Sequence, residues 1–542
     1  MSIWRPPPGL VGDLGLLRVS SAMARADERG CPASLAARAR PAVWPRGGPE
    51  PRRPVRPGFV FGPFMAALDL IEHHGLSAGA ALEAAAQATD REPAPHPGLM
   101  EWTRQAVERY VTAGPVVAGT ARLDPSPSEW VYRWQSEQTG WVYEITAWGR
   151  RYRSPDGSVR ELRMPRLGRA GERDRDPAEV AVAAYVAAFG LSAQLLRWSK
   201  PYQVCEGPEQ VSWVRVTEYG CADGSVGVLF EGSPTAAEAA FREQGRPLLT
   251  EAVSGGTERP GEWCVKCKLR AACRALPRAS GLLGVTGTGQ PVRTWSMTNG
   301  RNYESCPARD HLRRLHLPRG EEYDETARRG IAVHAAIGEL HGRSPHVPCS
   351  ERELRVNAEG WQLGPDQARM AARQAAWHLP VCPLAAVPDF GDVRPEHTFA
   401  VHDPAANVIV LAKPDLLYTD RGSWVWRETK TRGRGGFTKT SALESFPQVA
   451  LGVALLASGI LGGDPTGSRF EMEILYPDGA DIYLLDPRDP ATVGRAREIV
   501  RDLVAAWHDD LLLDPRPGSW CADCEVARWC TAGLGFRHEA VA

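Results

Sequence analysis

The sequence predicts a mixed α/β protein made of two tandem modules, each a mixed sheet flanked by helices and closed by four cysteines. Three observations predict this. The 542 residues are 43% hydrophobic and 24% charged, which suits more than one globular domain. Helical and strand periodicities alternate along the second half of the chain. The cysteine pattern C-x2-C-x5-C occurs twice, in WCVKCKLRAAC at 263–273 and in WCADCEVARWC at 520–530.

The apolar periodicity of the second half predicts a series of helices and strands. Helices are expected at 303–315, 325–341 and 365–378, and strands at 397–401, 407–412 and 423–427. A helix at 445–457, strands at 470–475 and 481–485, and a last helix at 489–511 complete the set. The mixture predicts an α/β core.

Charged residues follow two of these strands. Pro414-Asp415 ends one strand, and Glu428-Thr429-Lys430 ends the next after a short turn. Because side chains alternate along a strand, Glu428 and Lys430 share a face, and normal hairpin pairing lets Asp415 approach it. Carboxylates bind hard divalent cations, and the lysine can orient an attacking water. Such a site stabilises the charge that develops on a phosphodiester during hydrolysis.

Two further residues are candidates for the same site. His334, on the preceding helix, offers a nitrogen ligand. Gln448, at the start of the next helix, offers a hydrogen bond to the site or to the substrate. A lone Glu-x-Lys is usually a solvated pair, so the hypothesis depends on all of these residues occurring together.

The cysteines indicate a second kind of site. Without an apolar signal segment a cytoplasmic protein is expected, where twelve cysteines are better interpreted as metal ligands or core thiols than as disulfides. Cys306 precedes the predicted core, and Cys521, Cys524 and Cys530 follow it, so one shared cluster would tie both ends together. An iron-sulfur cluster and a zinc ion are the competing interpretations. The cysteines outside the two patterns, Cys205, Cys221, Cys349 and Cys382, are expected to be core thiols.

The ordered motifs resemble the iron-sulfur branch of the PD-(D/E)XK nucleases, the RecB and AddB type. They are Ser296, Cys306-Pro307, Gly330-x3-His334, Pro414-Asp415, Glu428-Thr429-Lys430, Gln448 and Cys521-x2-Cys524-x5-Cys530, over about residues 290–532. Family members often have glycine where Ala412 stands and tyrosine where Gly452 stands.

The resemblance implies a restriction-endonuclease-like fold and a metal-dependent DNA nuclease, exonuclease-like on single strands or ends, in repair, recombination or phage defence. It implies that His334, Asp415, Glu428 and the carbonyl of Thr429 bind Mg2+ or Mn2+, and that Lys430 serves the attacking water. It also implies that Cys306, Cys521, Cys524 and Cys530 hold a [4Fe-4S] cluster.

The first half repeats the order of the second, as expected for an internal duplication. Its cluster ligands would be Cys31, Cys264, Cys267 and Cys273, with Cys205 or Cys221 as substitutes for Cys31. When the halves are aligned, Ala66 falls opposite His334, Arg163 opposite Lys430 and Glu179 opposite Gln448, and Asp415 has no acidic counterpart. Only Glu161, opposite Glu428, is kept, so residues 1–280 are predicted to be an inactive copy. Residues 281–293 are predicted to be a linker and 294–542 the active module.

Composition limits the partners. A formal net charge of -1 excludes a uniformly basic surface, so contact with DNA must be local. No apolar run is long enough to span a membrane, and GRGGFTKT at 433–440 lacks the glycine that a P-loop needs before its lysine. Any unwinding is therefore expected from a separate helicase. The alternative from another class is a non-catalytic DNA-binding or assembly scaffold, which has no need of His334, Asp415, Glu428 and Lys430.

Overall fold

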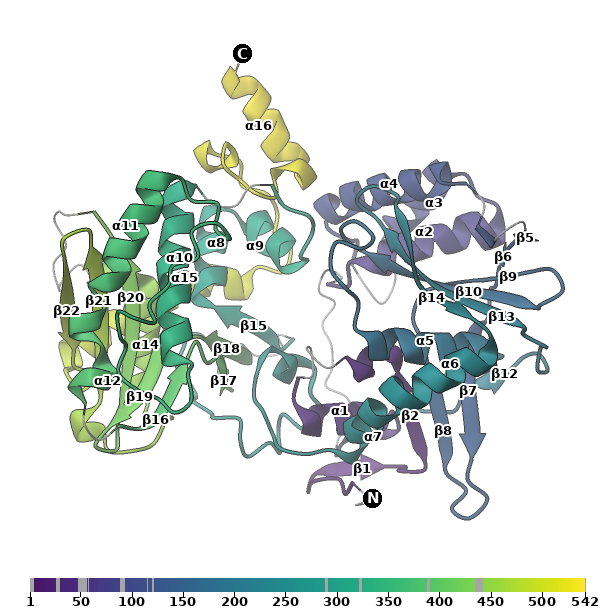
Figure 1. The fold of residues 1–542 in the computed structure, drawn as a ribbon, viewed down its shortest axis with the longest axis horizontal. Coiled ribbons are helices and arrows are strands. Elements are labelled where there is room, and N and C mark those ends of the chain that lie inside the picture. Colours follow the sequence, from purple (N-terminus) through teal and green to yellow (C-terminus); the bar gives the residue numbers. More distant parts are fainter. Residues whose placement is uncertain are drawn as a thin grey trace.

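A computed structural model describes residues 4–25, 30–46, 56, 58–87, 93–114, 116–118, 121–287, 291–320, 324–387, 390–433 and 442–541. The chain forms two α/β halves that lie side by side (Figure 1). Within these residues, every helix is too short or too polar to span a bilayer.

The C-terminal half is built on a five-stranded mixed sheet. Its second and third strands form a hairpin around Arg421 and Gly422, which both have positive φ. The third and fourth strands are parallel, and the other neighbouring pairs are antiparallel. In spatial order the strands are β16 (Phe390–Pro395), β19 (Leu416–Asp420), β20 (Ser423–Thr431), β21 (Arg469–Tyr476) and β22 (Gly479–Leu485).

Helices cover both faces of this sheet. Two parallel strands must be joined by a crossover connection, and the apolar helix α14 (Pro447–Ala457) forms this connection from β20 to β21. Gly452 allows its close approach, because a Cβ there would lie 2.5 Å from the Phe470 ring. The helix α15 (Pro490–Asp509) packs on α14, while α10 (Glu325–His341) and α11 (Pro365–Ala376) cover the opposite face.

Most elements predicted for this half are present, but two predictions are wrong. The helix expected at 303–315 is two helices, α8 (Met297–Ser305) and α9 (Pro307–Arg314), because Pro307 lacks an N–H and begins a new helix after Cys306. The strand before Asp415 is not the hairpin partner of β20. That strand lies in a smaller sheet, ordered β15 (Arg293–Ser296), β18 (Val408–Ala412) and β17 (Phe399–Asp403), and the partner of β20 is β19, which begins after Asp415.

The N-terminal half contains a sheet with the same strand order and directions. Its parallel pair is again joined by a buried apolar helix, α5 (Pro177–Phe189). In spatial order the strands are β6 (Asp124–Pro125), β9 (Arg150–Arg153), β10 (Val159–Arg166), β13 (Trp213–Gly220) and β14 (Val226–Gly232).

A second sheet of this half also has a counterpart. Its parallel pair β2–β8 corresponds to the parallel pair β15–β18 in the other half. On the other side of β8 lies the antiparallel strand β7, as the antiparallel strand β17 lies beside β18. The spatial order is β12 (Gln203–Val204), β11 (Leu191–Gln194), β7 (Glu129–Gln135), β8 (Val142–Thr146) and β2 (Leu16–Ser20). The remaining helices of this half are α1 (Pro32–Arg38), α2 (Phe61–His74), α3 (Ala78–Ala85), α4 (Pro97–Thr112), α6 (Pro234–Ala240) and α7 (Arg246–Ser254).

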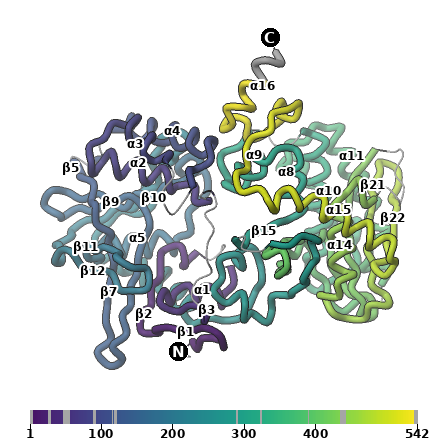
Figure 2. Tube along the Cα trace, turned by 180° about the vertical axis from the view of Figure 1, so that it is seen from behind, coloured from purple at the N-terminus to yellow at the C-terminus, as the bar shows by residue number. Residues whose placement is uncertain are grey.

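The two halves share packed contacts. Leu99 and Trp102 of α4 lie in one core cluster with Leu312 of α9 and Trp529 near the C-terminus, where the last part of the chain passes close to the N-terminal half (Figure 2). The ring centroids of His96 and His311 are 5.1 Å apart at this contact. The halves are therefore joined by apolar packing as well as by the chain.

The start of the segment predicted as a linker, 281–293, packs against the C-terminal half. The carboxylate of Asp403 accepts hydrogen bonds from the backbone N–H groups of Gly281 and Leu283, at 2.8 and 2.9 Å. Leu282 and Leu283 are buried in the core that contains β18 and α14. Residues 288–290 lie outside the described part of the chain, as do residues 434–441, which include most of GRGGFTKT.

Candidate active site and cysteine groups

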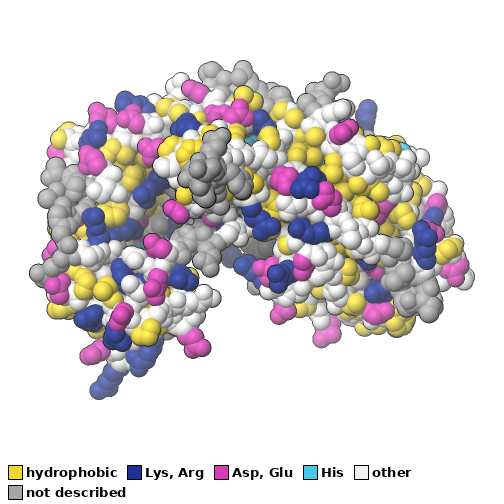
Figure 3. Space-filling view, turned by 90° about the horizontal axis from the view of Figure 1, so that it is seen from above, with side chains coloured by type: hydrophobic (Ala, Val, Ile, Leu, Met, Phe, Trp, Pro, Cys, Tyr) yellow, Lys and Arg dark blue, Asp and Glu magenta, His cyan; other side chains and the backbone are white. Residues whose placement is uncertain are grey.

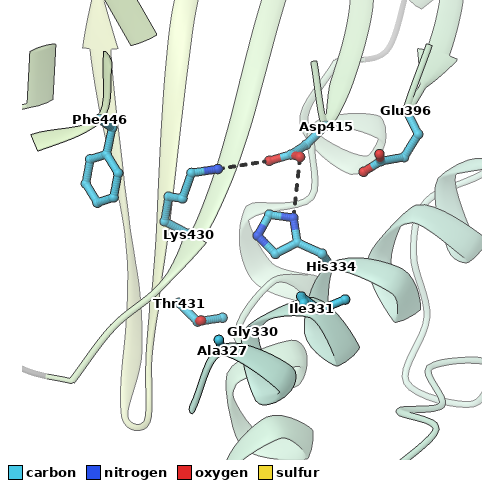
Figure 4. Close-up of a pocket in the computed structure, with 9 residues that line it drawn as sticks. All are labelled: Ala327, Gly330, Ile331, His334, Glu396, Asp415, Lys430, Thr431 and Phe446. Atoms are coloured by element: carbon cyan, nitrogen blue, oxygen red, sulfur yellow. Dashed lines mark ion pairs between the residues drawn. The ribbon is translucent and has the colours of Figure 1, made fainter. Parts of the chain in front are cut away.

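Four of the predicted site residues meet at one end of β20. The Nζ atom of Lys430 lies 3.1 Å from Oε2 of Glu428 and 3.5 Å from Oδ2 of Asp415. The other carboxylate oxygen of Asp415 lies 3.4 Å from Nδ1 of His334. His334, Asp415 and Lys430 line an open cavity of about 420 Å³, and Asp415 points between the other two (Figure 4).

Local structure explains this convergence. Glu428 and Lys430 project from the same face of β20, and α10 carries His334 to the end of the sheet. Asp415 directly precedes β19, and its Oδ2 accepts a 2.7 Å hydrogen bond from the backbone N–H of Thr429. The strand that carries the Glu-x-Lys pair thus holds the aspartate in place.

The charges of the group depend on one another. Burial favours a neutral Asp415, but Lys430 and His334 outweigh it and hold the pKa of its carboxyl well below the ordinary value. Burial, followed by repulsion from Asp415, raises the pKa of Glu428. Burial opposes the charge of Lys430, yet Asp415 and Glu428 together raise its pKa to about 12. The lysine is therefore a fixed cation between two carboxylates.

Thr429 contacts this group of side chains through its carbonyl, whereas Gln448 does not line the cavity. The carbonyl oxygen of Thr429 accepts a 3.0 Å hydrogen bond from Nζ of Lys430, so this oxygen faces the group. Gln448 is half-buried in the first turn of α14. The lining of the cavity includes Phe446, two residues earlier, but not Gln448.

The structure adds one residue that the sequence did not predict. Glu396 lines the cavity, and its carboxylate lies within 4.8 Å of candidate ligand atoms of both His334 and Asp415. It follows β16, whose last residue pairs with Leu416, so antiparallel pairing places Glu396 beside Asp415. Its carboxylate forms a 2.6 Å ion pair with Lys413.

The N-terminal half has no equivalent group among its described residues. Glu161 was predicted opposite Glu428, and the structure contradicts this, because Glu161 lies on the other face of its strand. Leu162 and Met164 pack with α5, so Glu161 lies on the opposite face of β10. Trp426 packs with α14 and donates a 3.0 Å hydrogen bond to Glu428, so Glu428 lies on the α14 side of β20. An alignment of the two strands that is wrong by an odd number of residues exchanges the two faces of a strand.

The carboxylate of Glu161 is also paired with arginine side chains. It is buried and forms ion pairs of 3.0 and 3.1 Å with Arg163 and Arg215. Arg150, near the position of Asp415, pairs with Asp69 and Glu72 of α2. Carboxylates neutralised by arginine have no free charge for a divalent cation.

The four C-terminal cysteines lie together. Cys306, Cys521, Cys524 and Cys530 all line one small cavity beside α9. Their sulfurs accept backbone hydrogen bonds, from Arg516 N to Cys306 at 3.3 Å and from Gly518 N to Cys521 at 3.5 Å. Burial raises the pKa of the Cys530 thiol, and the neighbouring Cys306 and Cys521 add to this.

The N-terminal cysteines have matching contacts. The backbone N–H of Arg259 donates to Cys31 Sγ at 3.2 Å, and that of Gly261 donates to Cys264 Sγ at 3.3 Å. The indole of Trp263 donates to the Arg259 carbonyl at 2.7 Å, as the indole of Trp520 does to the Arg516 carbonyl at 2.9 Å. Cys31 packs in one cluster with Cys267, and Cys264 packs with Cys273 in another.

Neither cysteine quartet is among the groups of close candidate ligand atoms in the described residues. Among the described residues, two groups place three or more candidate ligand atoms within 4.8 Å of one another. They are His334, Glu396 and Asp415 in the cavity, and His341, Cys349, His378 and Cys382 elsewhere. Of the four cysteines predicted to be core thiols, Cys221 and Cys382 are buried, whereas Cys205 is exposed, so that prediction is wrong for Cys205.

Comparison with known families agrees with the C-terminal geometry. A model of the PD-(D/E)XK nuclease superfamily matches residues 294–531. No curated protein matches the chain. The C-terminal region therefore has the PD-(D/E)XK fold, and the matched range contains His334, Asp415, Glu428 and Lys430 as well as Cys306, Cys521, Cys524 and Cys530.

Proposed function

We propose that the C-terminal half is a metal-dependent DNA nuclease that hydrolyses phosphodiester bonds in single strands or at ends. The observation that carries this proposal is the convergence of His334, Asp415 and Lys430 on one open cavity, with Glu428 3.1 Å from the Lys430 ammonium, within the region that resembles the nuclease superfamily. Each of these residues has a distinct task in such a reaction.

The donor set fits Mg2+ or Mn2+. His334, Asp415 and Glu396 bring one nitrogen and two carboxylate oxygens within 4.8 Å of one another, and hard divalent cations prefer oxygen ligands. Asp415 and Glu428 are two carboxylates beside the single cation of Lys430. The geometry favours His334, Asp415 and Glu396 as ligands, and the family resemblance adds Glu428 and the Thr429 carbonyl. When bound, the cation supplies Lewis-acid stabilisation of charge on the phosphodiester.

Lys430 has the geometry to position the attacking water. Its ammonium group hydrogen-bonds Glu428 and the Thr429 carbonyl, so its position is fixed before substrate arrives. With a pKa of about 12 it stays protonated at neutral pH. Its position suits it to orient the attacking water by donating hydrogen bonds and positive charge.

We further propose that each cysteine quartet holds a [4Fe-4S] cluster. A single zinc ion needs sulfurs about 3.8 Å apart, from Zn–S bonds of about 2.3 Å in a tetrahedron. Neither quartet is among the groups with ligand atoms within 4.8 Å, and a cluster of four irons separates its cysteines more widely than one ion does. Backbone N–H groups directed at the sulfurs are also a feature of iron-sulfur sites.

We propose that the N-terminal half is an inactive copy of the same fold that contacts or steers DNA. The matching strand order and the matching contacts of the cysteine loops support a duplication, and the arginine-neutralised Glu161 supports the loss of chemistry. On the face seen in Figure 3, Lys and Arg side chains are interspersed with Asp and Glu. DNA contact is therefore local, and a separate helicase would supply unwinding.

The test is an assay on end-labelled single- and double-stranded DNA with Mg2+ or Mn2+. Protein purified without oxygen should degrade DNA, and chelation should stop it. Asp415→Asn removes a ligand charge and Lys430→Met removes the positioning cation, so each should lower the rate by about 100-fold or more.

Matched controls separate chemistry from folding. Asp481→Asn changes an exposed aspartate on β22 of the same sheet, and Lys200→Met changes an exposed lysine of the other half. Both should retain the wild-type rate. Equal degradation by wild type and by Asp415→Asn would refute the assignment.

A further inference from the structure

A second group of metal-ligand side chains lies behind the nuclease strand, on the face covered by α10 and α11. It consists of His341 at the end of α10, Cys349 in the following loop, His378 after α11, and Cys382 before the short helix α12 (Pro383–Ala386). His341, His378 and Cys382 are buried and Cys349 is half-buried. Their candidate ligand atoms all lie within 4.8 Å of one another.

The separations match the edges of a tetrahedron around zinc. The Nε2 atoms of His341 and His378 are 3.2 Å apart. Cys349 Sγ lies 3.7 Å from His378 Nε2, and Cys382 Sγ lies 3.9 Å from His341 Nε2. Zn–N bonds of about 2.0 to 2.1 Å and Zn–S bonds of about 2.3 Å require edges of roughly 3.3 Å between nitrogens and 3.6 Å between nitrogen and sulfur.

The histidine nearest the sheet is oriented as metal ligands are. Nδ1 of His378 lies 2.7 Å from Oε1 of the buried Glu473, which leaves Nε2 facing His341 and Cys349. A carboxylate behind the imidazole fixes the tautomer and makes the ligating nitrogen more basic. The second oxygen of Glu473 accepts a 2.8 Å hydrogen bond from the hydroxyl of Thr429. One chain of contacts thus runs from this group to the residue between Glu428 and Lys430.

The loop that carries Cys349 lacks regular secondary structure. Residues 342–364, between α10 and α11, form turns without a helix or strand, and a bound ion would tie this segment to both helices. Sulfur ligands disfavour Mg2+ and Mn2+, and two nitrogens with two sulfurs in a tetrahedron are typical of zinc. With four protein ligands there is no open position, so such a site is structural rather than catalytic.

We propose that His341, Cys349, His378 and Cys382 bind a structural zinc ion that supports β20 through Glu473 and Thr429. This site is separate from the cavity of His334 and Asp415 and from both cysteine quartets. Its existence does not depend on nuclease activity, because metal content can be measured directly.

The experiment measures zinc, iron and sulfide in the intact chain, together with X-ray absorption at the zinc edge. We expect about one zinc per chain with two sulfur and two nitrogen neighbours. A chain without zinc, or zinc with four sulfur neighbours, would overturn the proposal. The second result would place zinc in a cysteine quartet instead.

A variant gives an independent readout. Cys349→Ser changes the ligand that is only half-buried, and it should reduce bound zinc at least tenfold while the iron content stays the same. Cys205→Ser, at an exposed cysteine outside all of these groups, is the matched control and should keep its zinc. Full zinc retention by Cys349→Ser would refute the assignment. If this variant does not fold, the absorption spectrum of the wild-type chain still decides the question.

Discussion

At the scale of single residues, Glu396 is a site residue that could not be predicted from its neighbours in the sequence. It stands 19 positions before Asp415, and nothing in the surrounding residues marks it as a ligand. Only the pairing of β16 with β19 brings the two side chains together. His334, Asp415, Glu428 and Lys430 could be proposed because strand alternation and helix position are local properties, whereas Glu396 depends on an unpredicted strand.

The charge of Glu396 should affect cation binding at the cavity. Glu396→Gln removes one negative charge beside Asp415, so we expect the Kd for Mn2+ to rise roughly 3- to 10-fold. The expected increase in Kd is modest because the Glu396 side chain is partly exposed. Titration calorimetry with Mn2+ measures this without reference to activity.

Lys413 provides a control in which a positive charge, not a negative one, is removed beside the cavity. Lys413→Gln removes the cation paired with Glu396, so Mn2+ should bind as well as before or more tightly. An unchanged Kd in Glu396→Gln would exclude this carboxylate from the cation site.

The same reasoning applies to the buried histidine-cysteine group. Cys349 and Cys382 were interpreted as core thiols because their partners, His341 and His378, are not marked by any longer pattern. The spacing His378-x3-Cys382 was the available signal. It was too short a pattern to outweigh the more frequent role of cysteine as a small apolar residue.

At the scale of elements, helices were predicted better than strand pairing. The helix over 325–341 agrees with α10, because an apolar stripe of helical period is a local signal. The division of the strands into two sheets, and the presence of β16 and β19, depend on which segments meet in space. The error at Glu161 had the largest consequence, since it placed a buried carboxylate on the wrong face.

The packing of α14 on the sheet should tolerate no side chain at Gly452. A Cβ there would lie 2.5 Å from the buried ring of Phe470 and 3.2 Å from Trp426, so Gly452→Ala should lower stability by about 1 to 3 kcal/mol. Thermal unfolding measures the change. For the same reason, a tyrosine at this position could not be accommodated without moving the helix.

Gly494 offers the matched helical control. It lies exposed in α15, and a Cβ added there would have no atom within 4 Å, so Gly494→Ala should raise stability by about 0.5 to 1 kcal/mol through helix propensity alone. If both alanines changed stability in the same direction, close packing at Gly452 would not be the cause.

At the scale of the whole molecule, each cysteine loop packs against the other half. Cys264 and Cys273 lie in a cluster with Ala400 and Ile409 of the C-terminal half. Trp529, beside Cys530, lies in a cluster with Leu99 and Trp102 of the N-terminal half. The loops therefore connect the two halves as well as closing each one, which makes loss of either quartet a change to the whole chain.

The contact between the halves should weaken in acid because of two buried histidines. Burial lowers the pKa of His96 to about 4 and that of His311 to about 3. Both are neutral in the folded chain, while in the unfolded chain each takes up a proton near pH 6.5. Their full contribution to stability is present above about pH 6.5 and is lost progressively as the pH falls toward 4, by about 2 kcal/mol per imidazole at pH 5.

Thermal unfolding at pH 7.5 and pH 5 tests this in wild type and in His96→Asn. Asparagine can still accept the 3.0 Å hydrogen bond that the N–H of Gly98 donates to His96 at the start of α4, but it does not titrate. The variant should therefore lose about 2 kcal/mol less than wild type between the two pH values. His74→Asn, at an exposed histidine at the end of α2, should follow wild type. Equal acid sensitivity in wild type and His96→Asn would mean that the carboxylates, and not this pair at the junction, set the response of the molecule to pH.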